Sequence, residues 1–151
     1  MPVIVKEIGC GLSGEVARRL VEAGVRIFDS SGLGGTSWAR IEARRAHDVD
    51  LGELFADWGV PTPESIAALA AIDGVTVIGS GGVRNGIDAA KAIAMGADLV
   101  GLAQPFLEPA TRSTEETTEA IADVVRQLEI AMFCVGARTL AELRATELVR
   151  R

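Results

Sequence analysis

Four glycine-rich segments, each following a short apolar run, carry most of the residues that could do chemistry. They are residues 6–11, 29–36, 80–86 and 101–104. Clustered glycines expose backbone N–H groups that can converge on an anion, and a helix that follows adds the partial positive charge of its first turn. These segments predict one ligand site that all four share. The alternative is that the glycines only form tight turns.

The third segment is the most informative of the four. Gly81 and Gly82 end an apolar run, and a helix is expected to begin at Asn85 or Gly86. Arg84 lies between the glycine pair and the start of the helix, and its planar guanidinium group can bind a phosphate through two parallel hydrogen bonds. A glycine pair alone would be a weak signal, but the arginine and the helix start together favour a phosphate site.

Lys6 stands at the end of the first apolar run. The chain has thirteen arginines but lysine only at positions 6 and 91, so lysine is not its usual cation. An ammonium group on a strand that is buried on both sides costs several kcal/mol unless it is paired or faces a ligand. Lys6 is therefore expected to hold an anion or polarise an electron-rich ring, or else to form an ion pair with Glu7 or Asp29.

Trp38 and Glu42 are four residues apart and would share one helix face if residues 37–45 are helical. An aromatic ring beside a carboxylate suits a substrate that develops positive charge, although a packed tryptophan and a solvated glutamate fit equally well. The preceding Gly-Gly-Thr, which ends at Thr36, can donate N–H groups and a hydroxyl to a cofactor or form a flexible loop. His47, the only histidine, lies in a polar run and is expected to be solvated.

Short apolar runs and helical patterns alternate along the chain. The runs at residues 3–6, 25–29, 76–80 and 99–103 lack period-two alternation, which predicts parallel strands buried on both faces. Helical patterns cover residues 13–23, 63–71 (with Thr62 as the capping residue), 85–95, 114–135 and 137–148. The apolar stripe of residues 114–135, with Met132 and Phe133, is expected in the core. The stretch from Gly32 to Gly59 is too long for an ordinary connection, and such loops usually have a function.

This alternation predicts an α/β fold, either an open doubly wound sheet or a (β/α)₈ TIM barrel. Four βα units are half of the eight that a barrel needs, so we expect a single half-barrel domain over residues 1–151. Ligands bind at the carboxyl ends of parallel strands in both architectures. In a barrel, a phosphate is frequently bound after the last two strands, where the third and fourth segments would lie.

Composition excludes several classes of function. The 151 residues carry a net charge of −6, which argues against a nucleic-acid partner, and no apolar run is long enough for a membrane span. With no signal peptide pattern, a cytoplasmic location is expected. Cys10 and Cys134 lack a CxxC spacing and are expected to be reduced thiols. One histidine and two cysteines leave little room for a zinc site or a Ser-His-Asp triad.

Several of these segments together resemble the type 2 isopentenyl diphosphate isomerase family. The matching segments, in the family's order over nearly the whole chain, are residues 3–11, 29–42, 57–62, 79–86, 97–106 and 131–137. The Gly-Gly-Thr-Ser-Trp run that ends at Trp38 is the most specific. Related FMN barrels, such as the 2-hydroxy-acid oxidases and inosine monophosphate dehydrogenases, share the glycine-rich phosphate loops.

The resemblance implies a barrel that interconverts isopentenyl and dimethylallyl diphosphate with reduced FMN, NADPH and Mg²⁺. It implies that Lys6 contacts the flavin ring and that a glycine-rich loop with Arg84 holds the FMN phosphate. The positions that match cofactor-binding residues are Lys6, Ser31, Thr36, Gly81, Gly82, Val83, Arg84, Ala103 and Gln104. Trp38 and Glu42 match positions near the substrate, where Glu42 is a candidate acid–base or substrate-orienting group.

The family's first four βα units are absent from this chain. They carry basic diphosphate-binding residues and the Gln and Glu that serve substrate and Mg²⁺, so no metal ligand is assigned here. Isomerase activity is therefore expected to require the missing half, whether the chain is a fragment, a split protein or a natural half-barrel.

Two other functions remain open. An FMN-binding module could pair with a second copy, since two sets of four strands would close a barrel. Another FMN-dependent oxidoreductase is less well supported, because those enzymes rely on an active-site histidine and His47 is not at a strand end.

Overall fold

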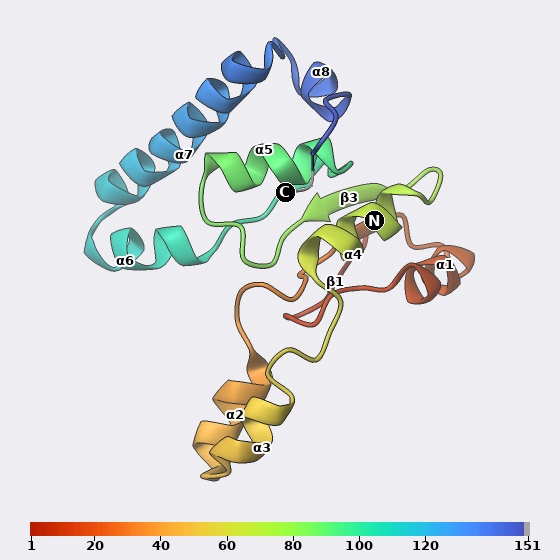
Figure 1. The fold of residues 1–151 in the computed structure, drawn as a ribbon, viewed down its shortest axis with the longest axis vertical. Helices are drawn as coiled ribbons and strands as arrows, with labels where there is room; N and C mark the ends of the chain where they lie inside the picture. The colour runs from red at the N-terminus through yellow and green to blue at the C-terminus, as the bar shows by residue number, and fades with distance from the viewer. Residues whose placement is uncertain (150–151) are drawn as a thin grey trace.

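The computed structural model describes residues 1–149 and contains one parallel sheet whose strands lie side by side in sequence order (Figure 1). The strands are β1 (Ile4–Lys6), β2 (Ile27–Asp29), β3 (Thr76–Gly79) and β4 (Leu99–Val100). A doubly wound sheet would reverse its strand order at one point, whereas strands that add in one direction are those of a barrel. The order therefore confirms a half-barrel and excludes the open alternative.

Helices connect the strands and extend beyond them. Their bounds are α1 (Gly14–Glu22), α2 (Trp38–Ala46), α3 (Val49–Leu54), α4 (Thr62–Ala70), α5 (Gly86–Ala94), α6 (Gln104–Arg112), α7 (Thr114–Val135) and α8 (Leu140–Arg144). Side chains of Ser13 and Asn85 accept N–H bonds at the starts of α1 and α5, close to where the sequence predicts these helices to begin. Thr62 is not a cap, because Pro61 occupies that position and the Thr62 hydroxyl donates to the Gly81 carbonyl oxygen at 2.6 Å. The last helix is shorter than predicted.

One face of the sheet packs against helices and forms the core. Phe28 and Val77 project from neighbouring strands and are paired in register. They pack against Ile66 and Leu69 of α4 and Ala92 of α5, and all five are almost fully buried. Removing these side chains from water is the main stabilising contribution to the fold.

The opposite face of the sheet is open, which contradicts the prediction of strands buried on both sides. Ile4 is 55% exposed and Leu99 57% exposed, and both lie on this face because they alternate with the core-facing positions. In a closed barrel this face points inward and is covered by the remaining strands. Within residues 1–149 no segment covers it.

The long helix α7 is not a core helix. It packs against α5 and α6, and Leu128, Ala131 and Met132 contact a small second cluster around Ile93. Phe133 is 85% exposed, so its assignment to the core was wrong. The cause is helical geometry, since Phe133 is one residue beyond Met132 and therefore points about 100° away from the contact. None of the helices described here is long and apolar enough to cross a membrane.

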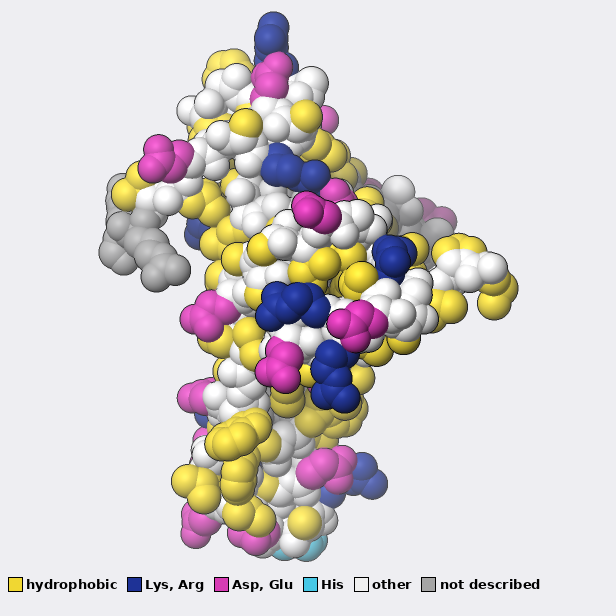
Figure 2. All heavy atoms as spheres, turned by 90° about the vertical axis from the view of Figure 1, so that its right-hand side faces the viewer, with side chains coloured by type: hydrophobic (Ala, Val, Ile, Leu, Met, Phe, Trp, Pro, Cys, Tyr) yellow, Lys and Arg dark blue, Asp and Glu magenta, His cyan; other side chains and the backbone are white. Residues whose placement is uncertain are grey.

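The stretch between Gly32 and Gly59 forms a helical arm made of α2 and α3, which pack against each other (Figure 1). Figure 2 shows hydrophobic side chains gathered at this end of the molecule. Val49, Leu51 and Leu54 of α3 are each more than half exposed. The arm begins directly after the β2 loop, so its base lies at the carboxyl ends of the strands.

Candidate functional site

A cavity of about 490 Å³ lies at the carboxyl ends of the four strands. Its walls come from all four glycine-rich segments, because parallel strands deliver their following loops to the same edge of the sheet. Its volume is within the range of small-molecule sites. The residues that the sequence assigned to a cofactor all line it: Lys6, Ser31, Thr36, Gly81, Gly82, Val83, Arg84, Ala103 and Gln104.

One end of the cavity is suited to an anion. Among residues 1–149, no acceptor receives the backbone N–H groups of Gly82, Val83, Leu102 and Ala103. Helix α6 begins here without a side-chain cap. Pro105 has no N–H and Phe106 donates to the Ala103 carbonyl oxygen at 3.0 Å, so in its first turn the N–H of Gln104 is the one without an acceptor among residues 1–149. The exposed Arg84 lines the same end and its guanidinium group forms no ion pair with the described residues. Free N–H groups, a helix start and an unpaired guanidinium together form a phosphate-binding arrangement.

The glycines at this end are required for packing between loops as well as for turns. Gly82 has a φ of +77°, and a Cβ there would lie 2.2 Å from the carbonyl oxygen of Gly34. Gly81 has a φ of +106°, and a Cβ there would lie 2.2 Å from the carbonyl oxygen of Gly32. The loops after β2 and β3 therefore meet backbone to backbone, which holds the N–H groups in place.

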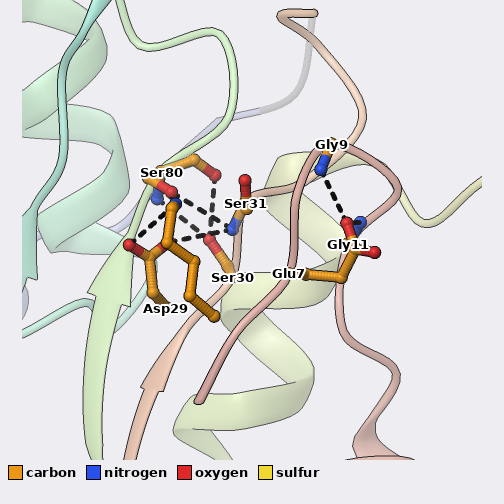
Figure 3. Close-up of polar contacts among 8 residues, drawn as sticks. Glu7, Gly9, Gly11, Asp29, Ser30, Ser31 and Ser80 are labelled. Atoms are coloured by element: carbon orange, nitrogen blue, oxygen red, sulfur yellow. Dashed lines mark hydrogen bonds and ion pairs between the residues drawn. The ribbon is translucent and has the colours of Figure 1, made fainter. Parts of the chain in front are cut away.

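The floor of the cavity is a network of polar side chains at the ends of β1, β2 and β3 (Figure 3). Lys6 donates from Nζ to Oδ2 of Asp29 at 3.0 Å, so of the two predicted ion-pair partners Asp29 is the one used. The Ser80 hydroxyl and the Ser31 N–H donate to the other oxygen of Asp29. The hydroxyl of the fully buried Ser30 donates to the carbonyl oxygen of Ser80 at 2.9 Å and accepts from the N–H of Ser80 at 2.9 Å.

Glu7 organises the loop that follows β1 instead of pairing with Lys6. Its Oε2 accepts N–H bonds from Gly9 at 2.6 Å, Cys10 at 2.5 Å and Gly11 at 3.1 Å, as Figure 3 shows in part. Burial by itself would raise the pKa of the Glu7 carboxyl, but the backbone N–H groups outweigh it and lower this pKa below its ordinary value. Ile8 and Gly9, which line the cavity, are thereby held by a carboxylate.

The two residues matched to substrate positions do not line the cavity. Trp38 lies next to it and donates from Nε1 to the carbonyl oxygen of Ile8 at 2.7 Å, which ties the arm to the β1 loop. Glu42 shares helix α2 with Trp38 but is exposed and forms an ion pair with Arg45 at 2.9 Å. His47 ends α2 in the left-handed conformation and is exposed, as predicted.

Asp29 and Ser80 are the cavity residues with polar side chains that the sequence did not assign to the cofactor. Both end predicted strands, and their positions beside Lys6 and Gly81 in the strand-end segments were the available signal. Within residues 1–149 no group of three or more His, Cys, Asp or Glu side chains is placed to hold a metal ion. Cys10 and Cys134 are both free.

Comparisons with known proteins agree with this architecture. The model of the FMN-dependent dehydrogenase family matches residues 1–150. Isopentenyl-diphosphate delta-isomerases of Stutzerimonas stutzeri and of a Synechococcus strain are 47% and 49% identical to this chain, over 99% of its residues and 44% of theirs. The chain thus spans less than half the length of these relatives. A crystal structure of mandelate oxidase with (S)-4-hydroxymandelic acid superposes with a TM-score of 0.71 at 26% identity, over 95% of this chain and 36% of that one.

Proposed function

The chain belongs to the family of FMN-dependent dehydrogenases, and from this premise we propose that it holds FMN and forms the carboxyl-terminal half of an isopentenyl-diphosphate isomerase barrel. One observation carries the proposal. Nine residues matched to cofactor positions, taken from four separate segments at the ends of the strands, line a single cavity. Identities of 47–49% with curated isomerases favour this activity over that of the oxidases, which are similar at 26%.

The residues present fit FMN at both ends of the cavity. The free N–H groups around Gly82 and Ala103, together with Arg84, supply donors for a phosphate. Lys6 lines the same cavity and presents its ammonium group for the electron-rich part of the flavin ring. Reduced FMN, when bound, supplies a ring that takes part in proton transfer without net redox change. The protein's part is to orient that ring and hold its phosphate.

The open face of the sheet supports pairing with a second half. Ile4 and Leu99 are exposed on it, and β1 and β4 each have one unpaired edge among the described residues. Unpaired edges and apolar faces are normally covered in parallel sheets. Because the isomerase relatives are more than twice as long, we propose that four further βα units complete the barrel. We place the diphosphate-binding residues and the Mg²⁺ ligands on those units. We further propose that NADPH reduces the FMN and that the protein acts in the cytoplasm.

A complementation experiment tests the proposal. The region of the Stutzerimonas stutzeri relative that precedes its match to this chain is co-expressed with the chain and the pair is purified. Isopentenyl diphosphate is supplied with FMN, NADPH and Mg²⁺, and dimethylallyl diphosphate is measured. We expect product from the pair and none from either half alone. A stable pair that retains FMN and forms no product would refute the isomerase assignment.

Pairing of two copies of the chain is the second candidate, because the same exposed strand face could be covered by a second copy. Sedimentation measurements at increasing concentration separate the two cases. A stable dimer that binds FMN and excludes the co-expressed half would favour the self-paired module. The oxidase alternative is not favoured by the geometry, since His47 lies at the end of α2 and does not line the cavity.

A further inference from the structure

We propose that Asp29 is a positioning residue that fixes the ammonium group of Lys6 at the floor of the cavity. The assignment of FMN as the ligand above this floor depends on the proposed function, but the positioning of Lys6 does not. Asp29 was not among the residues matched to a cofactor. Asp29 lines the cavity, but both of its carboxylate oxygens accept hydrogen bonds from the protein itself.

The side chain of Asp29 is much more buried than that of Lys6, as expected if Asp29 holds Lys6 in place. The Asp29 side chain is 12% exposed, whereas that of Lys6 is 53% exposed. The buried carboxylate is therefore the fixed partner, and the ammonium group is the one that a ligand in the cavity can reach. Lysine has a flexible four-carbon stem, so its charge has no defined place unless a fixed partner provides one.

The carboxylate of Asp29 is itself held on both oxygens. Oδ2 accepts from Lys6, and Oδ1 accepts from the Ser80 hydroxyl and from the Ser31 N–H at 3.2 Å. Ser80 directly follows β3 and is hydrogen-bonded to the buried Ser30, which directly follows β2, so the carboxylate is anchored where two neighbouring strands end. A buried carboxylate with three donors cannot rotate away without leaving a charge unsatisfied.

Lys6 retains hydrogen-bonding capacity after this contact. An ammonium group has three N–H donors, and within residues 1–149 the only acceptor for Lys6 is Asp29. The other donors are available to a ligand, since Lys6 lines the cavity. The geometry thus assigns Asp29 to orientation and Lys6 to contact.

The first experiment measures the Lys6 amine directly and requires no flavin. The chain has lysine only at positions 6 and 91, so reductive methylation followed by peptide mass spectrometry reports both rates in one sample. We expect Asp29→Asn to raise the rate of Lys6 relative to Lys91 by roughly two- to fivefold, the range for a partly exposed ion pair. Ser80→Ala, which keeps the charge of Asp29 but removes one anchor, should give a smaller increase.

Asp98→Asn is the matched control. Asp98 also pairs with a cation, Arg144, and accepts a backbone N–H from Val77, but it lies at the opposite end of the sheet. The Asp98→Asn substitution should leave the ratio of the Lys6 and Lys91 methylation rates unchanged. Equal ratios in the wild type, Asp29→Asn and Ser80→Ala would overturn the proposal.

The second experiment is a double-mutant cycle on FMN affinity. If Asp29 acts through Lys6, Asp29→Asn weakens FMN binding by about fivefold in the wild type and by less than about twofold in Lys6→Met. A purely structural role would give the same loss in both backgrounds and would overturn the proposal. A folded wild type that binds no FMN, but whose Lys6 responds as expected to methylation, would refute the proposed function and support the positioning of Lys6.

Discussion

Replacing Arg84 with alanine separates the phosphate end of the cavity from its ring end. Arg84 is exposed, lines the cavity and forms no ion pair within residues 1–149, so its removal leaves no charged partner unsatisfied. The fold should therefore be retained. The substitution should lower the affinity for ligands that carry a phosphate.

The size of the effect follows from the hydrogen bonds that are lost. Hydrogen bonds to a charged group contribute about 1.5–3 kcal/mol, and each 1.4 kcal/mol is a factor of ten in affinity. Solvent screening at an exposed site puts the effect at the lower end, so Arg84→Ala should weaken FMN binding by roughly 10- to 30-fold. The N–H groups near Gly82 and Ala103 remain and should preserve residual binding.

The assay is quenching of flavin fluorescence with FMN and, in parallel, riboflavin, which lacks the phosphate. Riboflavin affinity should change by less than about twofold in Arg84→Ala, because the lost contact is with the phosphate. Arg126→Ala, an exposed arginine on α7 outside the cavity, serves as the matched control and should change neither affinity. Equal weakening of FMN and riboflavin by Arg84→Ala would refute the assignment of this end to the phosphate.

Three further substitutions test other parts of the site. Glu7→Gln should lower the free energy of unfolding at pH 7 by about 1–2 kcal/mol, because Glu7 stabilises three N–H groups as a carboxylate. Since folding lowers its pKa, this contribution is present above the ordinary value of 4.5 and is lost as the pH falls through the lowered pKa, so urea denaturation of wild type and variant should converge in acid. Gly82→Ala should cost about 1–3 kcal/mol more than Gly74→Ala, since both have positive φ but only Gly82 meets neighbouring backbone; equal losses in denaturation would contradict the packing of the two loops. Glu42→Gln should leave FMN affinity unchanged while reducing turnover of the complemented barrel, and unchanged turnover would remove Glu42 from the substrate site.

The gathering of nine cofactor-matched residues around one cavity was accessible from the sequence. Glycine-rich segments after each strand carry a geometric consequence, because parallel strands place their following loops at one edge. All four short strands lie within the predicted runs, and α1 and α5 begin close to the predicted residues, because these signals are local. The ion-pair partner of Lys6 could not be found from local signals, because Asp29 lies 23 residues away in the sequence. Alternation along β1 sends Glu7 to the other face, while Asp29 lies directly opposite Lys6 in the register of β2.

The features that sequence reasoning missed depend on which neighbours are present. Phe133 fits an apolar stripe, but only the face of α7 that meets α5 is covered. The strands were predicted to be buried on both faces because they are apolar throughout, and apolarity does not specify whether the covering layer belongs to the same chain. Thr62 has the residue type of a helix cap, yet its hydroxyl bonds to Gly81, a contact between segments 19 residues apart.

We propose above all that the four strand-end segments form a preformed FMN site within this chain. Equilibrium dialysis of the purified chain against FMN tests it most directly, with the size of the protein measured in the same preparation. The predicted result is saturation at one FMN per chain, with weaker binding of riboflavin. A folded chain that retains no FMN above the level of the dialysis buffer would contradict the claim.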